Sequence, residues 1–331
     1  MTDTMVLDAA DVRLTVSAAD GGRMASLVVR GHELLVTVGY GPTMWGVYPF
    51  APFAGRIRDG RFQFNGMEVK LPLNLPPNAI HGTVFERAWR VQGPETISTD
   101  LGPNWPFRGR VTQQFEVRTD GLDVTLRLEA EDRMPATLGW HPWFVRRLAG
   151  ADSDVELRFS AERMYERAPA GLPTGRLVAP KPGPWDDCFV GVHSAPRLTW
   201  PGNLALELRS TADHWVVYSE LPDAVCVEPQ TGPPDGVNLG RSEIVERGDM
   251  LSVEMSWTWW SPGEVAPSLS GSSSRRSGGP AGSTDDANGC HRCGGRRLHR
   301  AEAIRQGGHL GVHVAGGQES VTLDPGPIKV G

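Results

Sequence analysis

Apolar and polar residues alternate along many short segments of this chain. The pattern is clear in residues 12–16, 122–128, 155–159, 204–208 and 251–259. Side chains of a β-strand point alternately to its two faces, so each segment has one apolar and one polar face. No long segment combines a helical period with a cap at both ends. The chain is therefore predicted to be all-β, with a large antiparallel β-sandwich as its architecture.

Turn signals separate the predicted strands. In residues 61–69, RFQFNGMEV, alternating apolar positions flank Asn65-Gly66, which predicts a hairpin with a tight type I′ turn. The 40 glycines and 27 prolines of the chain supply further turns between short strands. These signals agree with an antiparallel sheet.

Charge and composition exclude several classes of protein. The formal net charge of -6 disfavours nucleic acid or an anionic membrane surface as a partner. No apolar run approaches the roughly 20 residues that span a bilayer, and the N-terminal residues lack a signal-peptide pattern. We therefore expect a cytoplasmic location with no membrane and no nucleic-acid partner. Four cysteines are too few for a disulfide scaffold, and Cys188 and Cys226 are predicted to be reduced and buried.

The composition changes sharply near residue 263. All 11 Trp, 4 Tyr and 10 Phe precede this point, and residues 264–331 are rich in Gly, Ser and Arg. Such a segment buries too little apolar surface to offset its ordering entropy, so it is predicted to be mostly disordered. Cys290, Cys293 and His299 superficially suggest a zinc site, but a second well-spaced ligand pair is missing and no metal is expected there. The expected domains are thus residues 1–263, the β-sandwich, and 264–331, the tail.

Two histidines and one glutamate stand in unusual settings. His141 lies in LGWHPWF between Trp140 and Trp143, and His81 lies in NAIHG. An imidazole titrates near neutral pH, and a sugar ring can stack on aromatic faces. Glu228, in VCVEPQTGPPDGVN, follows a short apolar strand, where apolar neighbours can tune a carboxylate for proton abstraction.

Two further stretches supply polar groups, and each has a plain structural alternative. Arg56 in FAGRI suits hydroxyl groups or a planar acceptor, although a single arginine more often forms a surface ion pair. Asp186 and Asp187 in WDDCFV lie beside an aromatic residue, but acids at such a place can simply shape a turn. A histidine beside tryptophan is likewise more often a packed residue than a catalyst.

The order and company of these stretches resemble the aldose 1-epimerase (galactose mutarotase-like) family. Four stretches carry the resemblance across roughly residues 10–260: PFAGRIRDGRFQFNG, NAIHGTVFERAWRV, LGWHPWF and VCVEPQTGPPDGVN. It implies the large β-sandwich, or supersandwich, of that family. It also implies an isomerase that interconverts the α and β anomers of a free aldose by acid/base ring opening and closure, without a cofactor.

The resemblance also implies roles for individual residues. His141 would be the general acid and Glu228 the general base, while Arg56, His81 and Asp186 would contact sugar hydroxyls. Trp140 and Trp143 are expected to form an apolar wall for the sugar. Two positions depart from the family pattern, because Gly55 replaces a frequent asparagine and Trp143 a usual tyrosine. The choice between Asp186 and Asp187 stays open.

Four other functions remain open from the sequence. A hexose-6-phosphate 1-epimerase would need arginines near the phosphate, and a carbohydrate-binding protein would need no proton carriers. A glycoside hydrolase would use Glu228 and Asp186 as its two carboxylates. A metal site could combine His81, His141 and Glu228. The partner in the favoured function is a small-molecule sugar, and the chain is expected to be a monomer or a homodimer. The arginines available for a phosphate are Arg58, Arg61, Arg87 and Arg90.

Overall fold

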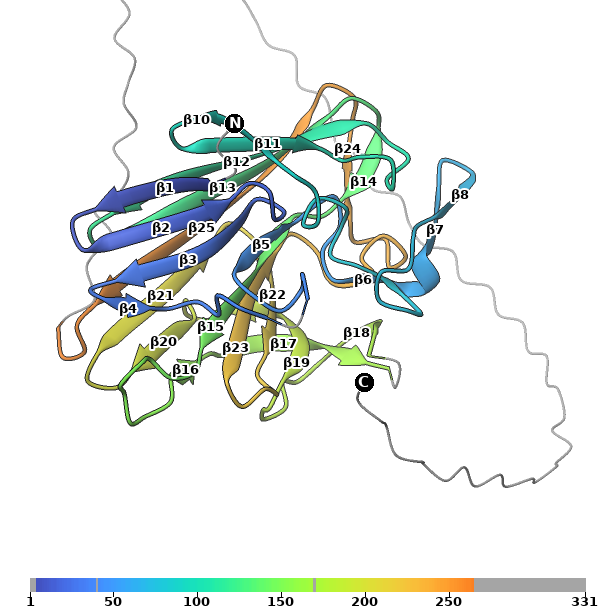
Figure 1. Ribbon diagram of the computed structural model, residues 1–331. Coiled ribbons are helices and arrows are strands. Elements are labelled where there is room, and N and C mark those ends of the chain that lie inside the picture. Colours follow the sequence, from blue (N-terminus) through green and yellow to red (C-terminus); the bar gives the residue numbers. More distant parts are fainter. Residues whose placement is uncertain (1–3, 40, 169–170, 265–331) are drawn as a thin grey trace, which may run out of the picture. The chain divides into compact units, whose positions relative to one another are not determined.

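The computed structural model describes residues 4–39, 41–168 and 171–264, which belong to one compact unit (Figure 1). The predicted disordered tail, including Cys290, Cys293 and His299, lies outside the described residues except for Glu264. No helix in the described part of the chain combines the length and the apolar character needed to cross a membrane. The prediction of an all-β protein is confirmed, since its regular elements are antiparallel strands and one short 3₁₀ turn.

The larger of the two main sheets carries the residues that matter for function. Within the described residues it has eleven strands, in the order β1-β2-β3-β5-β15-β23-β22-β19-β17-β18, with β4 paired to β3. Its strands are β1 (Thr4–Ala9), β2 (Val12–Ser17), β3 (Arg23–Val29), β4 (His32–Glu33), β5 (Val47–Phe50), β15 (Gly139–Val145), β17 (Ala161–Arg167), β18 (Pro173–Val178), β19 (Asp186–Val192), β22 (His214–Tyr218) and β23 (Ala224–Gln230).

The second sheet has eight strands among the described residues and covers one face of the first (Figure 1). Its order is β10-β11-β12-β13-β25-β21-β20-β16. Most of the segments with clear alternation in the sequence became strands of this sheet. The strands are β10 (Arg90–Gly93), β11 (Thr96–Asp100), β12 (Gly109–Arg118), β13 (Gly121–Ala130), β16 (Glu156–Arg158), β20 (Arg197–Trp200), β21 (Leu204–Ser210) and β25 (Met250–Trp260).

Three small strand pairs complete the unit. The predicted hairpin at Asn65-Gly66 is confirmed, because β7 pairs with β8 and both turn residues have positive φ, 49° and 76°. The pair β6–β9 brings residue 56 next to residue 80 at the rim of the larger sheet. The remaining elements are β6 (Arg56–Ile57), η1 (Arg58–Gly60), β7 (Arg61–Phe64), β8 (Met67–Lys70), β9 (Ala79–Ile80), β14 (Met134–Ala136) and β24 (Glu243–Val245).

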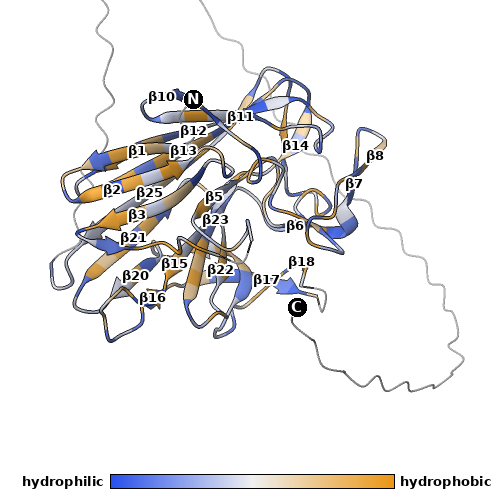
Figure 2. Ribbon diagram, in the orientation of Figure 1, coloured by the Kyte–Doolittle hydropathy of each residue, from blue (hydrophilic) through white to orange (hydrophobic). Residues whose placement is uncertain are grey.

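The main core lies between the two sheets. Apolar residues at every second position of the strands enter this layer, and Figure 2 shows the resulting mixture of apolar and polar positions along them. Phe115 on β12, Leu126 on β13 and Trp257 on β25 are fully buried there. Burial of side chains of this size stabilises the fold by about 1.5–3 kcal/mol each. This layer fixes the larger sheet, whose opposite face is then free to carry polar side chains.

Candidate active site

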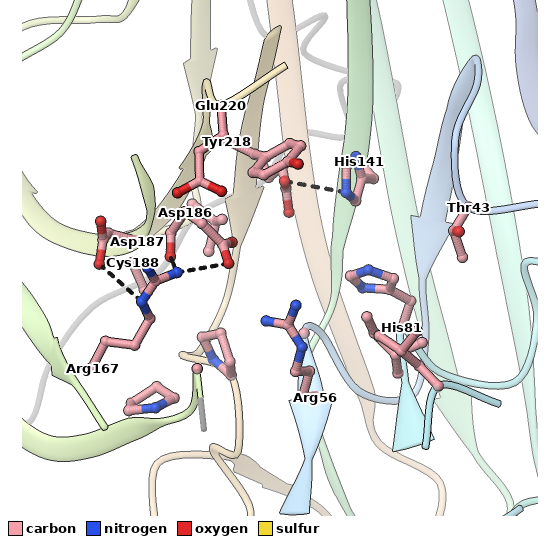
Figure 3. Close-up of a pocket in the computed structure, with 18 of the residues that line it drawn as sticks. Thr43, Arg56, His81, His141, Arg167, Asp186, Asp187, Cys188, Tyr218 and Glu220 are labelled. Atoms are coloured by element: carbon pink, nitrogen blue, oxygen red, sulfur yellow. Dashed lines mark hydrogen bonds and ion pairs between the residues drawn. The ribbon is translucent and has the colours of Figure 1, made fainter. Parts of the chain in front are cut away.

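A pocket of about 300 Å³ opens on the face of the larger sheet that points away from the core. It is lined by side chains from β15, β17, β19, β22 and β23 and by loops at the rim (Figure 3). The volume is at the lower end of the range for small-molecule sites. Six of the seven residues expected at the site line this pocket: Arg56, His81, His141, Trp143, Asp186 and Glu228.

His141 and Glu228 face each other across neighbouring strands. The pairing of β15 with β23 matches Gly139 with Gln230 and Trp143 with Cys226, which places residue 141 opposite residue 228. The Nε2 atom of His141 is 3.3 Å from the Oε1 atom of Glu228. The two residues are only 6% and 3% exposed. Strand register therefore brings together two groups that are 87 positions apart in the sequence.

Burial sets the protonation of this pair. It lowers the pKa of His141 to about 3, with the positive charge of Arg56 acting in the same direction. Burial also raises the pKa of Glu228 well above its usual range, and the nearby Asp186 adds to this effect while Arg56 opposes it. Both shifts disfavour a charged group. One proton shared by the two groups, with no net charge on the pair, is the form that these shifts favour.

Aromatic rings fix the orientation of the His141 imidazole. The ring stacks against Tyr48 at a centroid distance of 5.0 Å and against Trp143 at 4.9 Å. Trp143 is itself held by its Nε1–H, which donates to the carbonyl oxygen of Thr43 at 2.8 Å. Tyr48, which pairs with His141 across β5 and β15, was not singled out in the sequence. The stacking leaves the imidazole little freedom to rotate.

The expectation that Trp140 forms a wall of the pocket is wrong. Its side chain is fully buried in the core between the sheets, where its Nε1–H donates to Oε1 of Gln113 at 3.0 Å. Successive residues of a strand point to opposite faces, so Trp140 cannot share the face of His141. Trp143, two positions after His141, does share it and lines the pocket as expected.

His81 lies at the turn after β9, and its ring centroid is 5.2 Å from that of His141. Its backbone has a φ of 61° and its N–H donates to the carbonyl of Gly55 at 2.8 Å. The imidazole stacks on Phe50 at 4.5 Å, and Nδ1 has no hydrogen-bond partner among the described residues. Burial, with further contributions from His141 and Arg56, lowers the pKa of His81 well below its usual range. A neutral imidazole with a free nitrogen can bond a sugar hydroxyl.

The Arg56 guanidinium points into the pocket beside His81 (Figure 3). None of the carboxylates in the described ranges lies within ion-pair distance of it, so its donors are available to a ligand. The preceding Gly55 has a φ of 62°, and a Cβ atom there would come within 2.8 Å of Pro234. Glycine, which has no Cβ atom, avoids this contact and adopts the positive φ without strain.

Asp186 and Asp187 both line the pocket, and both interact with Arg167. The guanidinium of Arg167 bonds Oδ2 of Asp186 at 2.7 Å and lies 3.8 Å from Oδ1 of Asp187. Burial raises the pKa of Asp186, whereas Arg56 and Arg167 oppose the rise. Arg167 carries no motif in the sequence and was missed, because only the neighbouring β17 and β19 bring it to the two acids.

A hydrogen-bond chain that runs from the exposed Asp213 through the buried His214 to Tyr165 also reaches the pocket and was missed. Nδ1 of His214 lies 2.6 Å from a carboxylate oxygen of Asp213, and Nε2 lies 3.1 Å from the hydroxyl of Tyr165. The tautomer that satisfies both contacts has its proton on Nδ1, facing Asp213, and Nε2 then accepts the hydroxyl hydrogen of Tyr165. Tyr165 lines the pocket. Its oxygen lone pairs are then left to accept a hydrogen bond from a ligand.

The comparison with protein families decides the identity of the fold. The family model described as "Aldose 1-epimerase" matches residues 4–258. The chain belongs to the aldose 1-epimerase family. The match spans both sheets of the sandwich and every residue discussed at the pocket.

Relatives of known sequence fit this assignment at low identity. The chain is 26% identical to the uncharacterized protein YphB of Escherichia coli over 232 residues, which are 62% of this chain and 78% of that protein. It is 31% identical to the galactose mutarotase of Mus musculus over 143 residues, 39% of this chain. That alignment spans 41% of the mouse protein, less than half of its length.

Solved structures support the same fold. A galactose mutarotase-like protein from Clostridium acetobutylicum superimposes with a TM-score of 0.69 at 17% identity, over 77% of this chain and 94% of that one. The GalM/aldose epimerase homologue from C. elegans gives a TM-score of 0.67 at 15% identity, over 78% and 98%. At these identities the likeness concerns the fold alone.

Proposed function

We propose that the protein is a cofactor-independent aldose 1-epimerase that interconverts the anomers of a free aldose. The observation that carries the proposal is the buried His141–Glu228 pair at the floor of the pocket, 3.3 Å apart. Two titratable groups whose pKa values are shifted strongly by burial, in a concave site, are typical of acid/base catalysis. Family membership supports the same reaction class.

The chemistry needs two coupled proton transfers. A hemiacetal opens when the C1 hydroxyl loses a proton and the ring oxygen gains one. In the reacting form the shared proton is on Nε2 of His141, which donates it to the ring oxygen, while Glu228 accepts the proton from the C1 hydroxyl. Rotation about C1–C2 and the reverse transfers close the ring with inverted configuration. Each proton carrier contributes about 10²–10⁴-fold.

The pair suits this cycle because its total charge stays constant. It gives one proton and takes one in each half of the reaction, so no net charge develops on it in the buried floor of the pocket. A single buried acid or base would have to create a charge there, and burial makes that costly. Two adjacent carriers avoid the cost.

Other pocket residues orient the sugar. Arg56 and His81 approach from one side, and Asp186, held by Arg167, from the other (Figure 3). Trp143 supplies an apolar surface beside the imidazole. Holding the sugar in one reactive orientation contributes a large part of the rate enhancement, because the entropy of orientation is lost on binding and not in the chemical step.

The charges of the pocket favour a free sugar over a 6-phosphorylated one. Only two arginines line it, and Arg167 is already paired with Asp186 and Asp187. Arg58 pairs with Asp235, Arg61 pairs with Glu68, and neither lines the pocket. Besides Glu228, three carboxylates line it, those of Asp186, Asp187 and Glu220, and negative charge on them would repel a phosphate.

The test is anomer interconversion followed by polarimetry or NMR over a panel of free and 6-phosphorylated aldoses. We expect turnover of at least one free aldose, and a lower kcat/KM for its 6-phosphate. Glu228→Gln keeps the size of the side chain but cannot accept the proton, so kcat should fall by about 10²–10⁴-fold. Binding of the sugar should change little.

The same measurements distinguish the enzyme from one alternative, a protein that binds carbohydrates without catalysis. If Glu228→Gln interconverts anomers at the wild-type rate, after correction for spontaneous mutarotation, the assignment of the base is wrong. If the wild-type protein binds sugars but accelerates none of them, the binding protein is the better description.

A further inference from the structure

The thiol of Cys226, a side chain that commonly binds metals, lies directly beside His141 and Glu228. Ligand atoms of His141, Cys226 and Glu228 all lie within 4.8 Å of one another. Cys226 and Glu228 are two positions apart on β23, so they share a face, and His141 is opposite on β15. All three residues are buried, at 6%, 0% and 3% exposure. The proposed reaction gives no role to the thiol of Cys226.

The set of donors suits one kind of ion. Imidazole nitrogen, thiolate sulfur and carboxylate oxygen are the ligands of Zn²⁺, and three protein ligands with one open position form a common arrangement. Tetrahedral Zn²⁺ bonds of about 2.0–2.3 Å place the ligand atoms about 3.5 Å apart, so small side-chain rotations would close the set. Mg²⁺ and Ca²⁺ prefer several oxygens and would find only one carboxylate.

Charge balance favours such an ion despite the burial. Cys226 as a thiolate and Glu228 as a carboxylate would together carry two negative charges, which balance the two positive charges of the ion. The usual penalty for placing a charge in an apolar site is therefore largely avoided.

We propose that His141, Cys226 and Glu228 form a binding site for Zn²⁺ and chemically similar ions, and that an ion there blocks anomer interconversion. The ion would occupy the atoms that otherwise carry the protons. Metal binding follows from the three donors alone, whereas the inhibition rests on the proposed function. Nδ1 of His141 has no partner among the described residues, so the acceptor that usually supports a metal-bound histidine is missing. Binding should accordingly be reversible by a chelator.

The experiment uses the full chain with Cys290→Ser and Cys293→Ser, which remove the two cysteines of the C-terminal segment and leave Cys188 and Cys226. After treatment with a chelator, Co²⁺ is titrated as the spectroscopic probe. We expect one Co²⁺ per chain with a thiolate-to-cobalt charge-transfer band, and Zn²⁺ should displace it. Cys226→Ser should abolish the band. Cys188→Ser is the matched control, a second buried cysteine outside the ligand cluster, and should keep it.

The rate provides the second readout. Zn²⁺ should suppress anomer interconversion and a chelator should restore it. Cys226→Ser should retain basal turnover but need at least about 10–100-fold more Zn²⁺ for the same suppression, because the loss of even an outer partner of a ligand has an effect of that size. Circular dichroism checks that the variant is folded. Should Cys226→Ser fail to fold, Glu228→Gln replaces it in the cobalt titration alone, where it should bind Co²⁺ more weakly while keeping the thiolate band.

Separate outcomes overturn the separate parts. A cobalt spectrum without the thiolate band, or one that Cys226→Ser leaves unchanged, overturns the metal site. A normal band together with a rate that Zn²⁺ does not alter overturns the inhibition. A normal band in a protein without any basal turnover leaves the metal site standing and contradicts the proposed function.

Discussion

At the scale of single residues, burial decides the chemistry of the pocket. An exposed histidine titrates near pH 6.5, whereas burial lowers the pKa of His141 to about 3. The same burial raises the pKa of Glu228. Because the two groups are in contact, these opposite shifts favour one proton shared by the pair. Neither residue would behave in this way at the surface.

This shared proton predicts the pH dependence of the reaction. A second proton binds to the pair only far below pH 6.5, since the pKa of His141 is lowered to about 3. The last proton leaves only above the raised pKa of Glu228. We therefore expect kcat/KM to show no step at the ordinary histidine pKa. A profile of initial rates against pH checks this, and a clear limb centred near 6.5 that His141→Asn removes would contradict it.

At the scale of elements, the two-residue period of β15 separates the two tryptophans around His141. Trp143 shares the pocket face with the imidazole, while Trp140 faces the core and bonds Gln113. The same period places Cys226 and Glu228 together on β23. Alternate residues of such a strand therefore pack in the core on one face and line the pocket on the other.

The two tryptophans consequently predict different effects of one substitution. Trp140→Phe leaves the carbonyl oxygen of Gln113 without its buried donor and removes volume from the core. It should destabilise the fold by about 1–3 kcal/mol with little change in KM. Trp143→Phe removes the bond to Thr43 at the pocket, so it should raise KM more than it lowers stability. Urea unfolding and steady-state kinetics of both variants measure the contrast, and a reversed order would contradict the assignment of faces.

At the scale of the whole molecule, the two faces of the larger sheet have different roles. The face toward the second sheet builds the core, and the opposite face carries the pocket. All aromatic residues of the chain precede residue 261, and the described strands end at β25. The strands and loops of the described part of the chain thus supply the pocket residues discussed above.

Removal of the C-terminal segment tests this self-sufficiency. A chain that ends after Glu264 should keep its thermal midpoint and its rate of anomer interconversion, because residues 4–264 contain both sheets and all the pocket residues named above. Thermal unfolding followed by circular dichroism, together with polarimetry, compares it with the full chain. A large fall in the midpoint would mean that residues 265–331 stabilise the folded unit.

The sequence by itself determined the fold class and the composition of the site. Alternation along short segments is a local property, and it was enough for the all-β prediction and for the hairpin at Asn65-Gly66. The same alternation indicates that Trp140 points to the face opposite His141. Its position next to His141 in the sequence had instead suggested a place in the pocket. The motifs identified residues that line the pocket because each motif gives a reactive or polar side chain a fixed position relative to its neighbours in the chain.

Only the tertiary structure decided which groups meet. The strand order β5-β15-β23-β22-β19 is set by packing between distant segments, and no local pattern encodes it. That order brings Glu228 and Cys226 to His141 and puts Arg167 beside Asp186. The protonation of the pair was equally hidden, since a pKa shift depends on burial and neighbours that exist only after the sheet has formed.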